Sequence, residues 1–335
     1  MILTVTLNLA LDVTYELPGV AWGEANRVAR VRARAGGKGV NVARVLHALG
    51  QEAVVTGLAG GATGDAVRAD LAAAGLPDAL VPIAAETRRT VAVIDAGRGY
   101  ATGFWEPGPP VSGDEWQRFT TTFARLLADA AAVVLSGSLP AGLPADAYAS
   151  LCREAADAGV PAILDTSGEA LRRCLPGHPA LVKPNAEELA EAAGARAGGE
   201  PPARGGTAGA PAAGGDAPAA GCVSPQDTLR AAEELRRVGA GAVVVSLGAD
   251  GLVAVAADGA WRAWPPQRVS GNPTGAGDAV VAALAVGLVA GRPWPERLVD
   301  AAAVSAAAVH APVAGSFDAA AYGRYRRAVR VEPLN

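Results

Sequence analysis

The chain of 335 residues is half apolar and 19% charged, a composition that fits a globular protein and excludes disorder of the whole chain. Its formal net charge of -4 gives no general attraction for nucleic acid or an anionic membrane, so neither is expected as a partner. Three cysteines without C-x-x-C spacing argue against a disulfide framework or a zinc site and indicate a reducing cytoplasm.

Apolar, β-branched runs alternate along the chain with helical patterns. The first run has no basic segment before it, so it predicts a strand and not a signal peptide. The predicted strands are residues 2–7, 53–58, 90–94, 132–135, 162–164, 180–182 and 242–246. The predicted helices are residues 39–49, 64–74, 112–130, 145–158, 186–193, 228–238, 278–290 and 294–310. This alternation is typical of an α/β protein with a mostly parallel sheet.

Three segments depart from this pattern. In residues 12–35 and 86–106 polar and apolar residues alternate, which predicts a small antiparallel sheet that projects from the core as a lid. Residues 195–225 are rich in Gly, Pro and Ala without periodicity, and they predict a disordered insertion. The insertion need not divide the chain, so residues 1–335 are predicted to form a single domain.

A glycine-rich loop, Asn272-Pro273-Thr274-Gly275-Ala276-Gly277-Asp278, opens an apolar helical stretch. Glycines allow a tight turn, and free amides at a helix N-terminus point toward a bound anion such as a phosphate in transfer. Asp278 lies where it can take a proton from an attacking hydroxyl. The sequence therefore predicts Asp278 as general base and Gly275, Ala276 and Gly277 as an anion hole, with an ordinary helix N-cap as the alternative.

A second glycine cluster, Gly36-Gly37-Lys38-Gly39-Val40-Asn41, precedes another predicted helix. It has neither the spacing of a Walker A loop nor that of a dinucleotide fingerprint. Gly37, Lys38 and Asn41 suit the hydroxyls and phosphate of a sugar, whereas the alternative is a plain loop before a helix. Lys38 and Lys183 are the only lysines, which indicates sites where a compact charge cannot be exchanged for arginine.

The third motif, Lys183-Pro184-Asn185-Ala186-Glu187-Glu188, joins a predicted strand to a predicted helix. Asn185 and Glu188 lie three residues apart on one helical face, so their oxygens can hold the water shell of Mg²⁺. A simple capping arrangement is the alternative.

Two further loops carry candidate ligands for a substrate phosphate. Ser138 follows a buried strand, and Arg88 leads into a lid strand. Loops at the carboxyl ends of strands form the ligand crevice in open α/β sheets, and Arg can bind phosphate through two parallel hydrogen bonds. Arg89 and Arg27 are weaker candidates, and each arginine taken alone is also explained as a solvated surface charge. The three histidines show no ligand spacing.

In their order and approximate spacing these motifs resemble the PfkB or ribokinase-like carbohydrate kinases, within the branch of phosphofructokinases and tagatose-6-phosphate kinases. Leu7-Asn8-Leu9-Ala10-Leu11-Asp12 matches the Leu-Asn-x-x-x-Asp start of that branch, and Gly36 to Asn41 match its Gly-Gly-Lys-Gly-x-Asn box. The resemblance implies a ribokinase-like three-layer sandwich with a small β-sheet lid. It also implies ATP and Mg²⁺ as cofactors, and a homodimer that pairs through the lid.

The resemblance further implies a role for individual positions of this chain. Those implied to contact the sugar phosphate, together with Lys38, are Asp12, Gly37, Asn41, Arg88 and Ser138. Those implied to contact the nucleotide, in addition to Gly277 of the anion hole, are Lys183, Asn185, Ser246 and Gly248.

Several substrates remain open. The interpretation adopted is a 1-phosphofructokinase-like enzyme that converts fructose 1-phosphate to fructose 1,6-bisphosphate with ATP. A tagatose-6-phosphate kinase or a 6-phosphofructokinase is the alternative, because Leu9 stands where the branch usually has Pro and Asn272-Pro273-Thr274 looks more like the tagatose enzymes. Lys38 and Arg88 argue against an unphosphorylated sugar. A catalytically silent sugar-phosphate sensor is disfavoured because the predicted base and anion hole are both present.

Overall fold

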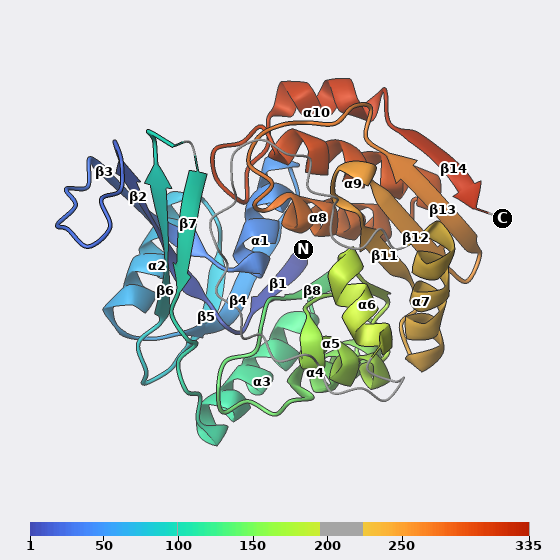
Figure 1. Cartoon of the computed structure of the whole chain (residues 1–335). Coiled ribbons are helices and arrows are strands. Elements are labelled where there is room, and N and C mark those ends of the chain that lie inside the picture. Colours follow the sequence, from blue (N-terminus) through green and yellow to red (C-terminus); the bar gives the residue numbers. More distant parts are fainter. Residues whose placement is uncertain (99, 195–223, 335) are drawn as a thin grey trace.

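The computed structural model of the chain describes residues 1–98, 100–194 and 224–334, and its centre is a ten-stranded sheet (Figure 1). The strand order is β14-β13-β12-β11-β10-β9-β8-β1-β4-β5. The strands are β1 (Ile2–Thr6), β4 (Ala53–Ala59), β5 (Asp78–Pro82), β8 (Ala132–Ser136), β9 (Ala162–Asp165), β10 (Leu181–Val182), β11 (Val243–Ser246), β12 (Leu252–Ala256), β13 (Gly259–Trp264) and β14 (Arg330–Leu334). The strands from β11 to β5 in this order are parallel to one another, whereas β12, β13 and β14 pair antiparallel. The predicted mostly parallel sheet is therefore confirmed.

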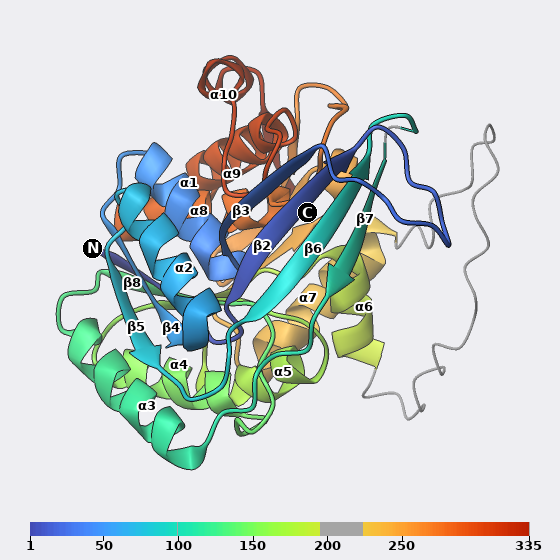
Figure 2. The ribbon, with the colours of Figure 1, turned by 90° about the vertical axis from the view of Figure 1, so that its left-hand side faces the viewer.

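Helices cover both faces of this sheet and complete three layers, as predicted (Figures 1 and 2). One face carries α1 (Lys38–Ala48), α2 (Gly61–Ala73), α8 (Ala276–Val289) and α9 (Trp294–Ala308), against which α10 (Ala319–Arg326) packs. The other face carries α3 (Gly113–Leu127), α4 (Ala147–Asp157), α5 (Gly168–Cys174), α6 (Ala186–Gly194) and α7 (Pro225–Val238).

The apolar strands supply a core on each side of the sheet. Val134 packs into the cluster under α1 and α8, whereas its neighbours Val133 and Leu135 pack into the cluster under α3 and α4. Successive side chains of a strand point to opposite faces, so a strand covered on both sides must be apolar at nearly every position. This is the reason why these strands could be recognised in the sequence as continuous apolar runs.

A separate four-stranded sheet projects beside the larger one, at the left of Figure 1, and is called the lid sheet below. Its order is β3-β2-β6-β7, formed by β2 (Ala10–Leu17), β3 (Arg30–Gly36), β6 (Arg88–Asp95) and β7 (Tyr100–Trp105). The predicted lid sheet is therefore present, but the prediction that it is antiparallel is wrong at its centre, where β2 and β6 pair in parallel. Strands β2 and β3 form one hairpin, and β6 and β7 form the other. The two hairpins pair through their first strands, β2 and β6.

Of the predicted insertion at residues 195–225, residues 195–223 lie outside the described part of the chain. Among the described residues no helix is long and apolar enough to cross a membrane.

Candidate active site

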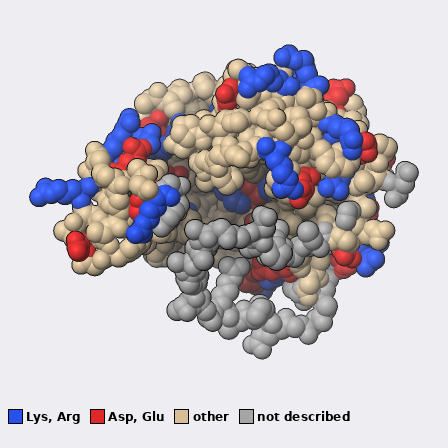
Figure 3. All heavy atoms as spheres, turned by 45° about the horizontal axis from the view of Figure 1, so that its top comes forward, with Lys and Arg blue, Asp and Glu red and all other residues tan. Residues whose placement is uncertain are grey.

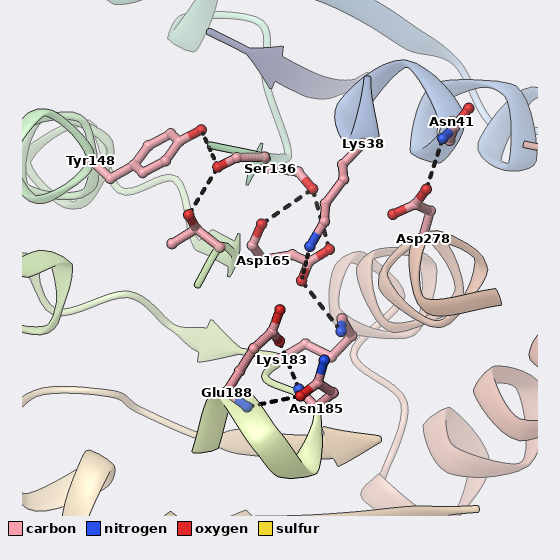
Figure 4. A network of polar contacts seen from close by, with 11 residues as sticks. Lys38, Asn41, Ser136, Tyr148, Asp165, Lys183, Asn185, Glu188 and Asp278 are labelled. Carbon is pink, nitrogen blue, oxygen red and sulfur yellow. Dashed lines mark hydrogen bonds and ion pairs between the residues drawn. The ribbon is translucent and has the colours of Figure 1, made fainter. Parts of the chain in front are cut away.

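The starts of α1 and α8 face each other near the carboxyl ends of the central strands of the large sheet. Gly37 precedes α1 with φ of 109°, and Gly275 precedes α8 with φ of 85°. A Cβ on Gly275 would lie 2.8 Å from the Cα of Ala314, so glycine is required there both for its conformation and for space. Across the gap Asn41 Nδ2 of α1 donates a hydrogen bond to Asp278 Oδ2 of α8 at 2.8 Å (Figure 4).

Asp278, the predicted base, is almost fully buried, with 6% of its surface exposed. Burial and the nearby carboxylate of Asp165 raise its pKa to about 7, while the hydrogen bond from Asn41 and the two lysines oppose the rise. A pKa near neutral matches the needs of a general base, which must be ionised in use yet able to hold a proton.

Lys38 and Lys183 converge on the buried carboxylate of Asp165, at the end of β9 (Figure 4). Their Nζ atoms lie 3.4 and 3.3 Å from Asp165 Oδ1, and only 1% of that side chain is exposed. Burial would raise the pKa of Asp165, but the two ammonium groups hold it below its ordinary value. Burial likewise opposes the charge of Lys38, whose pKa is nevertheless raised by Asp165, Glu188 and Asp278. The two lysines and Asp165 together thus carry one excess positive charge in a site that also holds the candidate base.

Asn185 and Glu188 form a reciprocal cap at the start of α6. Glu188 Oε2 accepts from the Asn185 backbone N–H, and Asn185 Oδ1 accepts from the Glu188 backbone N–H, each at 2.8 Å. The capping alternative is therefore realised in the geometry. It does not exclude a metal role, because the cap holds the Glu188 carboxylate near Lys38 and the Asp165 cluster.

A cavity of about 470 Å³ adjoins the start of α8. Four predicted nucleotide contacts line it, namely Asn185, Ser246, Gly248 and Gly277. The rest of its wall includes apolar side chains from β12, α8 and α9, such as Leu252, Val280 and Ala306. A large, mostly apolar cavity with a few polar groups at one end suits a flat organic base joined to a charged group.

Several of the predicted substrate residues meet where the lid sheet joins the body. Figure 3 shows that the molecule is hollowed between its lid side and its body. Asn8 connects two of them, because its Nδ2 donates to Ser138 Oγ at 2.9 Å and its backbone oxygen accepts from the Arg88 guanidinium at 3.3 Å. Asp12 accepts a hydrogen bond from Thr90, and Arg88 lies close enough to stabilise its charge. These polar groups lie on the lid side of the site, whereas Lys38 lies at its centre.

Comparison with known proteins decides the family. The model of the pfkB family of carbohydrate kinases matches residues 6–319. The chain belongs to this family. Phosphofructokinase-2 from Escherichia coli, in complex with potassium, is 28% identical with a TM-score of 0.84 over 97% of this chain and 98% of its own. A possible 1-phosphofructokinase from Thermotoga maritima is 25% identical, with a TM-score of 0.82 over the full length of both chains.

The fold is also found in a kinase structure with another sugar. Ribokinase from Arabidopsis thaliana, complexed with ribose and ATP, has a TM-score of 0.70 over 97% of this chain at 20% identity. The predicted ribokinase-like fold and the predicted kinase are thus confirmed, because this chain is a carbohydrate kinase by family and by fold.

Two residues of this candidate site were not predicted from the sequence. Asp165 was not predicted, although it lies at the end of a buried strand, and a position near a strand end was the signal that selected Ser138. Asn8 was read only as part of a motif, and its two contacts depend on loops that are 80 and 130 residues away. Of the weaker candidates, Arg89 forms an exposed ion pair with Glu106, and Arg27 lies exposed between β2 and β3.

Proposed function

We propose that this pfkB kinase transfers the γ-phosphoryl group of ATP to a hydroxyl of a ketohexose monophosphate, giving the bisphosphate. The observation that carries the proposal is the pairing of a buried carboxylate of raised pKa, Asp278, with two lysines that meet at Asp165. Asp278 accepts the proton, and the two lysines balance the charge of the phosphates. Phosphoryl transfer requires both functions.

In the proposed reaction Asp278 takes the proton of the attacking sugar hydroxyl as the hydroxyl oxygen bonds to the γ-phosphorus and the bond to ADP breaks. The amides of Ala276, Gly277 and Asp278 at the start of α8 face the developing negative charge. Lys183 lies beside this turn, because its Nζ is 3.6 Å from the position of a Cβ on Gly277. No covalent phosphoenzyme is needed.

Asn185 and Glu188 are the residues proposed to hold Mg²⁺, through its water shell. The donor set fits this ion, because Mg²⁺ prefers oxygen ligands, keeps several waters and commonly takes only one or two carboxylates. Glu188 also lies close enough to Lys38 to favour its charge, so this pair borders the charged cluster. When bound, the ion neutralises charge on the ATP phosphates.

The proposed substrate is fructose 1-phosphate, with tagatose 6-phosphate and fructose 6-phosphate as alternatives. Support for a phosphorylated sugar comes from Arg88, which is half-buried beside Asp12 and Ser138 at the lid, away from the transfer site. A guanidinium in that place can bind the phosphate that is not transferred. The similarity to two phosphofructokinases supports a ketohexose.

The experiment that tests this function is ADP release from Mg-ATP with fructose 1-phosphate, fructose 6-phosphate, tagatose 6-phosphate, fructose and ribose. We expect turnover of one phosphorylated ketohexose to exceed that of fructose and ribose by at least about 100-fold, the scale of a lost charge-assisted contact of about 3 kcal/mol. Faster turnover of an unphosphorylated sugar would refute the proposed role of Arg88.

The raised pKa of Asp278 predicts a pH dependence. The base acts as the carboxylate, so kcat/KM should rise with pH up to about 7 and then level off. Asn41→Ala removes a hydrogen bond to the ionised form and should move this rise to higher pH by about one unit, since such bonds contribute about 1.5 kcal/mol. The measurement is the pH profile of kcat/KM for both proteins.

The control for this prediction is Ser138→Ala, which removes a predicted substrate contact that does not touch Asp278. It should raise KM and leave the position of the pH profile unchanged. A profile that is the same in Asn41→Ala and the wild type would show that the Asn41 contact does not tune the base.

We also propose a homodimer that pairs through the lid sheets. Asp12 and Thr90 bond to each other and face the site, so their neighbours Val13 and Val91 point to the opposite face of the sheet. The strand register adds Val31, Val93 and Phe104 to that outer face. Val31 and Phe104 are 58% and 50% exposed, and such an apolar sheet face is typical of a protein interface.

Val31→Asp should therefore convert the dimer to monomers, with a dimer dissociation constant raised at least about tenfold, because the substitution buries a charge between two apolar faces. Val289→Asp is the matched control, since Val289 is also an exposed valine (41%) but lies at the end of α8. The measurement is the oligomeric state of both variants by sedimentation. If both sediment as the wild type does, the lid is not the interface.

A further inference from the structure

A second cavity lies at the opposite ends of the helices that form the active site. It measures about 260 Å³ and is lined by Leu49, Gln51, Ala283, Val286, Arg292, Asp300, Tyr322 and Arg326. None of these residues lines the nucleotide cavity. Helix α8 contributes its start to the nucleotide cavity and its third turn to this one. The surrounding helices α1, α8, α9 and α10 form the upper left of Figure 2.

The lining includes a charged cluster centred on the buried Asp300 of α9. Asp300 is 5% exposed and accepts hydrogen bonds from Arg292 Nη1, Arg326 Nε and the Tyr322 hydroxyl. Two guanidinium groups thus share one carboxylate, which leaves the cluster with one excess positive charge. An arginine has five N–H donors, so a single bond from each to Asp300 leaves donors for another acceptor.

The lining also includes apolar side chains, from Leu49, Ala283 and Val286. The cavity is partly open to solvent, and Arg326 in its lining is 53% exposed. A ligand can therefore enter from the surface and reach both the guanidinium groups and the apolar side chains. Apolar walls with a few converging polar groups are the usual form of a small-molecule site.

We propose that this cavity is a binding site for a small organic monoanion, namely a carboxylate with an apolar body. The carboxylate lies against Arg326 and Arg292, and the body lies against Ala283 and Val286. The single excess charge of the cluster favours a monoanion over a polyphosphate. Helix α1 ends at this cavity, with Leu49 as its C-cap, and the negative end of the helix dipole lowers the positive potential of the site. This also favours a monoanion over a polyphosphate.

The position of the site gives it a regulatory role in the proposed kinase reaction. Helix α1 carries Lys38 and Asn41 at its start, and α8 carries the turn with Asp278 at its start. Both helices reach this cavity with their later residues, and they pack against each other between the two sites. An occupant therefore contacts both helices whose relative position sets the bond between Asn41 and Asp278.

The test uses benzoate as the probe and benzamide as its neutral match, titrated by calorimetry with the ATP analogue AMP-PNP present to occupy the nucleotide cavity. Benzoate should bind with a dissociation constant on the order of 1 mM, the range for a ligand of this size, and benzamide should not bind measurably. Arg326→Met should weaken benzoate at least about tenfold, as expected for a lost charge-assisted bond. Arg324→Met, on the same helix but outside the cavity lining, should leave it unchanged.

A second variant, Ala283→Leu, fills the apolar wall, keeps every charge and should also abolish binding. The proposed site would be overturned if benzoate bound equally to the wild type, Arg326→Met and Arg324→Met. It would also be overturned if benzoate did not bind the wild type at 20 mM, about 20 times the expected dissociation constant. Saturating benzoate should change kcat/KM at least about twofold in the wild type but not in Arg326→Met, and no change in either would overturn the regulatory role. Failure of the proposed kinase activity itself would not affect the binding result.

Discussion

Asp278→Asn should lower turnover at least about 100-fold while sugar-phosphate binding is retained, because the amide keeps the shape of the side chain but cannot accept the proton. Asn41 can still donate to the remaining oxygen at this position, so the local structure is preserved. Steady-state kinetics gives turnover, and calorimetry with the sugar phosphate gives binding. Turnover within threefold of the wild type, far less than the minimum loss for a general base, would contradict the assignment of the base.

The same variant should be more stable than the wild type at pH 8, which distinguishes a catalytic role from a structural one. The pKa of Asp278 is raised from 3.8 to about 7 in the folded protein, so ionising it costs folding free energy as pH rises through this range. Above pH 7 the full cost is present, and an uncharged amide removes it. We expect the free energy of unfolding to increase by at least about 1 kcal/mol in urea titrations, well below the limit set by the shift.

The control for both measurements is Asp70→Asn, which alters an acidic side chain that pairs with Arg44 outside the proposed reaction centre. It should retain most of the turnover and should not gain stability, because its carboxylate is stabilised by a cation and by the Ala35 backbone N–H. A gain in stability there would show that any lost carboxylate stabilises this protein.

Much of the fold could be predicted because the sheet is covered on both faces. Strands such as Val133 to Leu135 are apolar at every position, and this pattern needs no knowledge of their partners. Strands β12 to β14 and β5, like helices α5 and α10, were not predicted. In the outer strands β13 and β14, Arg262 and Arg330 each lie over the ring of Trp264, and these residues break the apolar pattern.

The candidate site was predictable where chemistry lies in one continuous segment, and it was missed where chemistry depends on tertiary contacts. The turn from Gly275 to Asp278 combines a left-handed glycine and a helix start, which sequence alone indicates. The cluster around Asp165 brings in Lys38 and Lys183, which lie 127 and 18 positions from Asp165 along the chain. Lys38 was predicted to bind the sugar phosphate from its motif, but only the folded chain shows it beside Asp165.

Asp165→Asn should destabilise the protein by about 3 kcal/mol, the lower part of the range for breaking a buried ion pair. Lys183 is 4% exposed and would remain buried with no carboxylate at this position, whereas Lys38, at 40%, can turn toward water. The measurement is the free energy of unfolding in urea at pH 7.5. Glu169→Gln, in the exposed pair with Arg173, is the control and should change stability by less than about 0.5 kcal/mol.

The double variant Asp165→Asn with Lys183→Met shows whether the cost comes from an unpaired charge. Removing the second partner takes away the buried ammonium, so much of the lost stability should return, although turnover should stay low because both groups lie in the proposed reaction centre. Single-variant losses that simply add would mean that Asp165 and Lys183 act independently. Recovery of stability without recovery of turnover would instead show that the buried charge cluster is kept for phosphoryl transfer at a cost to folding.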